Sequence, residues 1–247
     1  NKFRYDGMGD TLILGEVLRI ATGKDTLEYG TDNLFTKMGL ENYDWWKDEA
    51  GNVMTGLNFE STLRDFVKFG MLWSKDVGLD AVYGENVIGE GKWGGEQLVS
   101  SSWITDAKTP VVVTTFADYI DFGYLMYKAT KLVSPASLDN KELTVDVYSA
   151  KGFNDNSIWT IPEHNLIVAR HGLYHGVVNI GNEKIMPIGD ITGTSIANMD
   201  NANYILTMYN GNVENTSVGW RCYNSGACGA DSLNDEHMLM KIIESIN

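Results

Sequence analysis

The chain has 247 residues, of which 43% are hydrophobic and 11% aromatic, so it is long and apolar enough to fold around a sizeable core. Its formal net charge of −14 argues against nucleic acid and anionic membranes as partners, because both would repel it. No apolar run approaches the roughly 20 residues that a membrane-spanning helix requires, so we expect no membrane span. We expect residues 1–247 to form a single domain.

Helix signals dominate the first half of the chain. Asp10 or Thr11 is a suitable N-cap for a helix that ends before Gly23. Its core-facing side chains are predicted to be Leu12, Ile13, Val17, Leu18 and Ala21. A weaker helix signal runs through Leu27, Leu34 and Phe35. Ser61 is a predicted cap for the helix in "STLRDFVKFGMLWS", and "SSSWITDAK" begins a shorter one.

Strand signals dominate the second half. "FGYLMYKA" and "LTVDVYSA" are rich in aromatic and β-branched residues, and "NSIWTI" and "NLIVARHGL" form a predicted hairpin through "PEH". The chain closes with an apolar helix face in "SLNDEHMLMKIIESI". Helices first and antiparallel strands later indicate an α+β fold, with an antiparallel sheet flanked by helices. Residues 75–97 and 175–232 are predicted to be long irregular segments, the second an insertion before the last helix.

The residues that bind metals or form disulfides give weak signals. Cys222 and Cys228 are close enough in sequence to form a disulfide in a turn-rich loop, which would indicate an exported protein, although two free thiols are the alternative. His171 and His175 have an HxxxH spacing, but the segment follows a strand, where two partly exposed histidines are the simpler interpretation. "PIGDITG" and "DNANYIL" could supply oxygen ligands to calcium or form a solvated loop. We expect no cofactor.

Tyr5 is the one residue whose position alone suggests chemistry. It comes directly before a predicted helix and is followed by Gly7 and Gly9, so backbone N–H groups and the positive helix end could depress the pKa of its phenol. A phenol in that position could transfer a proton. A tyrosine that serves only the core or the surface is the alternative.

Several segments, read together, resemble one enzyme family. "FRYDGMGDTLILGEVLRIATGKDTLEY" resembles the tyrosine-motif region of serine β-lactamase-like hydrolases, in the branch of class C β-lactamases, 6-aminohexanoate-dimer hydrolases and related esterases. "LFTKMGLENYDWWKDEAG", "GLNFESTLRDFVKFGMLW", "GGEQLVSSSWI" and "YSAKGFNDNSIWTIPEHNLIVARHG" are similar to later family segments, in the family's order. The likeness covers residues 3–172 and the last helix. It implies a β-lactamase-like fold.

The resemblance also implies a mechanism in which Tyr5 assists proton transfer to and from a nucleophilic serine. The family carries that serine in a Ser-x-x-Lys helix several dozen residues before the tyrosine, and this chain has no Ser-x-x-Lys. We therefore expect an upstream segment of the same protein to supply the serine, the first helix and the first strands. This chain would then be the C-terminal part of a β-lactamase-like domain, inactive alone.

The third family motif corresponds to a predicted strand from Gly152 to Asn156, where the resemblance implies oxyanion-binding backbone and substrate contacts. The substrate-binding residues would be Lys151, Phe153, Asn154 and Asp155. Asp155 adds a carboxylate that disfavours an anionic β-lactam, so we expect a neutral or cationic small-molecule amide or ester. The expected location is secreted or periplasmic. The alternative function is a non-catalytic binding relative with the same scaffold.

Overall fold

The computed structural model describes residues 7–57, 59–74, 88–113, 120–134, 139–152, 156–171, 178–180, 183–185, 204–209, 212–216 and 235–246. Its helical elements lie close to the predicted positions. They are α1 (Gly7–Thr22), α2 (Thr26–Gly30), the π-helical turn η1 (Thr31–Phe35), α3 (Leu63–Trp73), α5 (Ser101–Lys108), the 3-10 turn η3 (Pro162–His164) and α6 (Asp235–Ile246). The cap of α3 is Thr62, whose hydroxyl accepts the backbone N–H of Asp65, one residue beyond the predicted Ser61.

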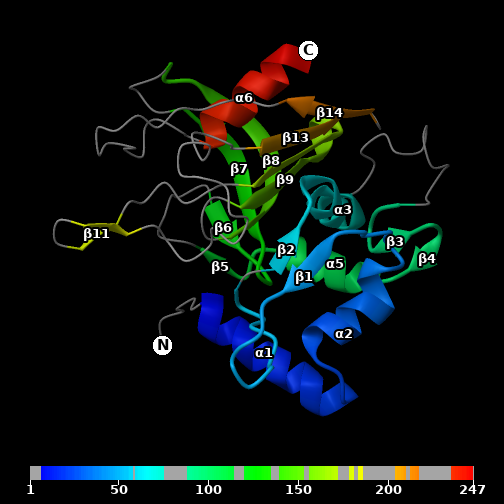
Figure 1. Ribbon diagram of the computed structural model, residues 1–247. Coiled ribbons are helices and arrows are strands. Elements are labelled where there is room, and N and C mark those ends of the chain that lie inside the picture. Colours follow the sequence, from blue (N-terminus) through cyan, green and yellow to red (C-terminus); the bar gives the residue numbers. More distant parts are fainter. Residues whose placement is uncertain are drawn as a thin grey trace.

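An eight-stranded antiparallel sheet forms the centre of the molecule, in the order β14-β13-β10-β9-β8-β7-β6-β5 (Figure 1). Its strands are β5 (Val112–Val113), β6 (Ile120–Phe122), β7 (Tyr127–Val133), β8 (Glu142–Lys151), β9 (Ser157–Ile161), β10 (Leu166–His171), β13 (Tyr204–Tyr209) and β14 (Asn212–Thr216). The predicted hairpin is confirmed: η3 joins β9 to β10, and Asn165 closes the turn in the left-handed conformation. The α+β class is therefore confirmed.

Short two-stranded ribbons accompany the main sheet. They are β1 (Tyr43–Trp45) with β2 (Phe59–Ser61), β3 (Lys92–Trp93) with β4 (Glu96–Gln97), and β11 (Val178–Ile180) with β12 (Glu183–Ile185). The prediction of an irregular segment at 175–232 is wrong where β11 to β14 form, and β13 pairs with β10 along six residue pairs. "YILTMY" has the β-branched and aromatic content of a strand. The sequence around it is rich in Asn and Gly, which is typical of loops, so the whole segment was predicted to be irregular.

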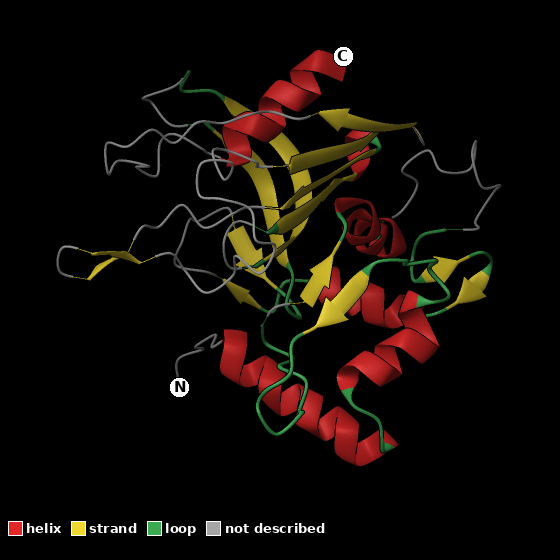
Figure 2. Cartoon of the chain, in the orientation of Figure 1, coloured by secondary structure: helices red, strands yellow, loops and turns green. Residues whose placement is uncertain are grey.

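Helices cover the sheet on both faces (Figure 2). Side chains alternate along β9, so Trp159 and Ile161 pack in the cluster with α6, whereas Ile158 packs in the cluster with α3. Gly70 lets α3 approach the sheet closely, because a Cβ there would lie 2.7 Å from Ile158 Cγ2. The central strands are therefore buried on both sides, which requires a nearly continuous apolar sequence.

Asp65 connects α3 to the preceding part of the chain. Its buried carboxylate accepts the backbone N–H groups of Glu41 (3.3 Å) and Asn42 (3.2 Å) and pairs with Lys68 (2.8 Å). Burial acts to raise the pKa of Asp65, but the hydrogen bonds from Lys68 and the two backbone groups favour the charged form and hold the pKa below its ordinary value. Lys68 also donates to the carbonyl of Gly39. One ion pair thus fixes the 39–42 turn against α3.

Replacing Asp65 with Asn should lower the free energy of unfolding by about 2 kcal/mol at pH 7, because Lys68 loses its partner and two backbone donors lose an anionic acceptor. The lowered folded-state pKa means that the stabilisation exists above the unfolded-state pKa and disappears as pH falls through the folded-state value. The difference between wild type and D65N should therefore shrink below about pH 4. Urea unfolding at pH 7 and pH 3 measures both values.

The matched control is Asp106→Asn, since Asp106 is an exposed carboxylate on α5. It should change the free energy of unfolding by less than about 0.5 kcal/mol. A D65N deficit of the same size at both pH values would show that the charge of Asp65 is not what stabilises the turn.

Candidate functional site

The structure describes the segments next to most of the predicted site residues, together with one of those residues, Lys151. Tyr5, Phe153, Asn154 and Asp155 lie outside the described residues, as do Cys222, Cys228 and His175. Lys151 is the predicted site residue that the structure places, at the end of β8. Two neighbouring features can therefore be examined: helix α1, which begins two residues after Tyr5, and the β8–β9 connection, which contains the third motif.

The third motif lies in a hairpin connection. Of the expected strand from Gly152 to Asn156, the structure describes the two end residues, and neither belongs to a strand, because β8 ends at Lys151 and β9 begins at Ser157; residues 153–155 lie outside the described residues. The backbone N–H of Gly152 donates to the carbonyl of Asn156 at 2.7 Å, which closes the loop. The flanking strands continue in register, with Lys151 opposite Ser157, so the chain reverses direction here instead of extending.

Lys151 is exposed, and its Nζ lies 5.8 Å from the centre of the Trp159 ring, within the range of a cation–π contact. Val145 and Val147 precede it at alternate positions of β8 and belong to the core on the α6 face. The side chain of Lys151 therefore stands on the α6 face of the sheet, at its end. It places a positive charge beside the hairpin that carries Asn154 and Asp155.

Helix α1 rests on the loop before β2 through small residues. Gly15 is buried, unlike the other residues of α1 from Met8 onward, and a Cβ at that position would lie 2.0 Å from Thr55 Oγ1. A Cβ on Gly56 would lie 2.6 Å from the carbonyl oxygen of Met8 and 2.7 Å from Thr11 Oγ1. The two backbones approach closely because both contact points lack a side chain.

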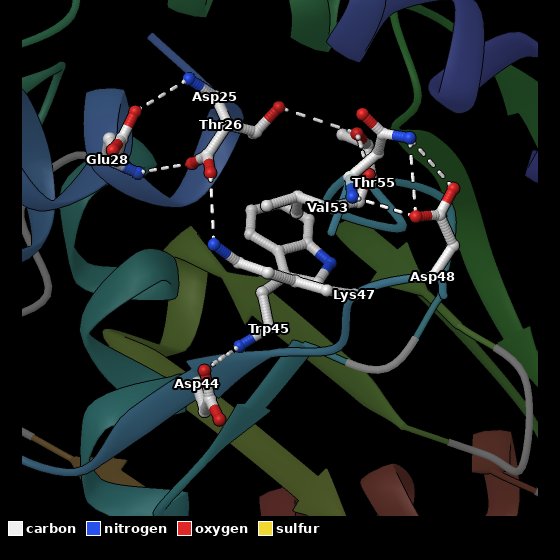
Figure 3. Close-up of polar contacts among 10 residues, drawn as sticks. Asp25, Thr26, Glu28, Asp44, Trp45, Lys47, Asp48, Val53 and Thr55 are labelled. Atoms are coloured by element: carbon white, nitrogen blue, oxygen red, sulfur yellow. Dashed lines mark hydrogen bonds and ion pairs between the residues drawn. The ribbon is translucent and has the colours of Figure 1, made fainter. Parts of the chain in front are cut away.

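Polar contacts hold this supporting loop against α2 (Figure 3). Lys47 pairs with Asp25 at 3.2 Å, and Asp25 also caps α2 by accepting the backbone N–H of Glu28 at 2.8 Å. The hydroxyls of Thr26 and Thr55 are 3.4 Å apart. The Trp45 indole N–H donates to the carbonyls of Met54 and Leu57. The position of α1 therefore depends on this loop.

The opposite side of α1 is apolar and exposed. Ile13 is 66% exposed, Val17 56% and Ile20 72%, and their i, i+4, i+7 spacing places them on one side of the helix. We call these three residues the outer stripe. The prediction that Leu12, Ile13, Val17, Leu18 and Ala21 face the core is wrong, since only Leu18 is partly buried. Gly15 and Thr11 provide the inward contacts instead, and periodicity could not show which side faces the core.

A pocket of about 740 Å³ opens on the sheet face opposite Lys151, between α5 and strands β7 and β8. Lys108, Lys128 and Tyr148 line it, and none of them was a predicted site residue. These residues belong to three separate elements, so no local motif marks them in the sequence. Among the residues that the structure describes, no group of three or more His, Cys, Asp or Glu side chains could hold a metal ion.

Comparison with known proteins gives no family assignment. No protein-family model matches the chain, and no curated protein matches it either. Within the described ranges, none of the helices has the length and apolar content needed to cross a bilayer. The arguments for function therefore come from the residues of this chain.

Replacing Gly15 with Ala should lower the free energy of unfolding by about 1–3 kcal/mol, because the new methyl group overlaps Thr55 Oγ1 where α1 contacts the loop. Combining it with Thr55→Ala should recover part of the loss, since that change removes the closest contact. Thermal unfolding followed by far-UV circular dichroism, over a double-mutant cycle, measures the coupling.

Glu16→Ala is the control, since Glu16 is exposed on α1 and its ion pair with Arg19 is exposed as well. It should leave the free energy of unfolding nearly unchanged, because an exposed ion pair contributes little. Strictly additive effects of the Gly15 and Thr55 changes would contradict the close contact.

Proposed function

We propose that this chain is the C-terminal part of a secreted serine hydrolase of the β-lactamase-like family, which cleaves amide or ester bonds through an acyl-enzyme. The observation that carries the proposal is the outer stripe of α1. Three large aliphatic side chains in a row on one exposed helix side are typical of a surface that another segment covers. That helix begins two residues after Tyr5, where the proposed fold requires an upstream segment carrying the nucleophile.

The arrangement of the family-like segments supports the same proposal. "RDFVKFG" lies on α3, which packs on the sheet, and "SIWTIPEHNLIVARH" forms the β9–η3–β10 hairpin beneath it. The antiparallel sheet with helices on both faces is compatible with a β-lactamase-like fold. That finer fold assignment rests on the resemblance together with this layering.

In the proposed reaction, the hydroxyl oxygen of the upstream serine attacks the carbonyl carbon of the substrate. Its proton passes to the lysine of the upstream Ser-x-x-Lys helix and to the tyrosine of the site. The same groups return a proton to the leaving alcohol or amine as the bond to the carbonyl carbon breaks. Water then attacks the acyl-enzyme, releases a carboxylic acid and restores the serine. Tyr5 is the proposed member of this proton-transfer pair in the present chain.

The substrate contacts in this proposal come from Lys151, Phe153, Asn154 and Asp155, at the β8–β9 hairpin. Asp155 follows Lys151 by four positions and adds a carboxylate to this part of the sequence, so a neutral or cationic amide or ester fits better than an anionic β-lactam. The same departure at Asn154 and Asp155 favours the second candidate, a binding relative of the family that has lost the chemistry.

A fluorophosphonate probe separates the two candidates. In the protein that includes the segment upstream of Asn1, the enzyme should incorporate one probe per molecule, on a serine outside residues 1–247, identified by peptide mass spectrometry. Tyr5→Phe should lower kcat for a 4-nitrophenyl ester by about 10²- to 10⁴-fold with a smaller change in KM, because proton transfer is lost and binding is not.

Tyr124→Phe is the matched control, because Tyr124 is an exposed tyrosine against Trp103, and it should leave kcat unchanged. A folded protein that incorporates no probe would favour the non-catalytic relative. Labelling of a serine within residues 1–247 would overturn the assignment of the nucleophile.

The outer stripe makes a separate prediction for the same longer protein. Replacing both Ile13 and Ile20 with Glu should lower its free energy of unfolding by about 2–4 kcal/mol, because two charges would enter a covered apolar contact. Val111→Glu, at an equally exposed apolar position outside α1, should have little effect. Equal melting temperatures for wild type and the double variant in differential scanning calorimetry would show that nothing covers the stripe.

A further inference from the structure

A second exposed apolar surface lies beside α5. Within the described ranges, the exposed large apolar side chains occur on α1 and in one other place, where they are Trp103, Val111, Tyr124 and Leu125. Trp103 comes from α5, and Tyr124 and Leu125 form the tip of the β6–β7 hairpin. Val111 is next to this hairpin, since its backbone N–H donates to the carbonyl of Phe122 at 2.9 Å. We call these four exposed residues the aromatic patch.

The two aromatic rings of the patch are held in fixed positions. The ring centres of Trp103 and Tyr124 lie 5.2 Å apart, yet Trp103 is 53% exposed and Tyr124 46%. Ser100 caps α5 by accepting the backbone N–H of Trp103 at 3.2 Å. A Cβ on the buried Gly123 would lie 2.4 Å from the carbonyl oxygen of Ala107, so the hairpin tip rests directly on α5. Exposed aromatic side chains on such a rigid support are typical anchors of a binding surface.

Leu125 adds an apolar side chain to the patch at a cost in backbone energy. Its φ of +57° lies in the left-handed region, which bulky residues avoid and glycine adopts freely. The turn is closed, since the backbone N–H of Gly123 donates to the carbonyl of Met126 at 2.7 Å. Leu125 is 44% exposed, so burial in the core does not offset this strain. Strained residues concentrate at binding positions, which is the role that the exposed Leu125 suits.

The charge beside the patch indicates the sign of the partner. Asp106 follows Trp103 by three residues, which places both side chains on one side of α5. Its carboxylate is exposed and has no ion-pair partner in the described part of the chain. The face of an indole ring also attracts cations. The formal net charge of −14 attracts a cationic partner from a distance as well.

We propose that the aromatic patch binds a basic, apolar peptide segment of a partner protein, with an arginine or lysine side chain over Trp103 and beside Asp106. Aliphatic side chains of the same segment pack on Leu125 and Val111. A cation between the indole ring and the carboxylate gains from both, whereas an anionic partner would be repelled. The proposal goes beyond the hydrolase proposal and does not depend on it, because none of these residues takes part in the proposed acyl transfer.

Fluorescence anisotropy tests the proposal, with a labelled octapeptide that alternates arginine and leucine, titrated with the full chain at an ionic strength of about 0.15 M. Binding should be saturable. Trp103→Ala should weaken it at least about tenfold, because an aromatic anchor is lost. Asp106→Asn should weaken it about two- to fivefold, because an exposed ion pair contributes less. Leu125→Gly should weaken binding without lowering the melting temperature, since glycine adopts the same φ without strain.

Val17→Ala and Glu49→Gln are the matched controls. Val17 is an apolar residue on α1 with an exposure similar to that of Trp103, and Glu49 is an exposed carboxylate outside the patch. Each should change the affinity by less than about twofold, because screening weakens the effect of distant charges. An octapeptide with glutamine in place of arginine should bind at least about tenfold more weakly, because it carries no cation.

Equal affinities of wild type and W103A would overturn the site, as would an equal loss in V17A. Equal affinity for the glutamine peptide would overturn the choice of a cationic partner. A failure of the arginine peptide to bind saturably would overturn the whole proposal. If circular dichroism shows that W103A is unfolded, D106N and L125G decide the matter, and wild-type affinity in both would overturn the site.

Discussion

The burial of the β9–β10 hairpin on both faces is the constraint on which the rest of the structure depends. Every residue of β9 is buried, and so is β10 from Leu166 to Arg170. Strands buried on both faces need a cover on each side, and α3 and α6 provide those covers from opposite ends of the chain. The hairpin therefore determines where both helices lie, although α3 begins at Leu63 and α6 at Asp235, 172 positions later in the sequence.

Helix α3 in turn determines the position of the N-terminal helices. Asp65 ties the 39–42 turn to α3, and the aromatic side chains of Phe35, Phe59 and Phe69 pack edge to face beside it. The loop that follows β1 then supports α1 through Gly15 and Gly56. A helix held by two glycine contacts has little room to move on its inner side, and its outer side remains available for another segment.

The sheet also separates two regions of different chemistry. Lys151 stands over Trp159 on the α6 face, whereas Lys128 and Tyr148 stand on the face of α5. Alternation along β8 produces this separation, because Tyr148 and Lys151 are an odd number of residues apart. One strand thus contributes Lys151 of the proposed hydrolase site to one face of the sheet and Tyr148, which lines the pocket, to the other.

The sequence by itself determined the elements whose signals are local: the capped helices α3 and α5, the Pro–Glu–His turn between β9 and β10, and the α+β class. Only the tertiary structure decided which side of α1 faces the core, because α1 carries apolar residues on most of its circumference and the contact is made by Gly15. It also decided that "YILTMY" joins the sheet and that Lys108 and Lys128 meet at Tyr148. Those outcomes depend on pairing register and on the distance between backbones, which are properties of segments far apart in the chain.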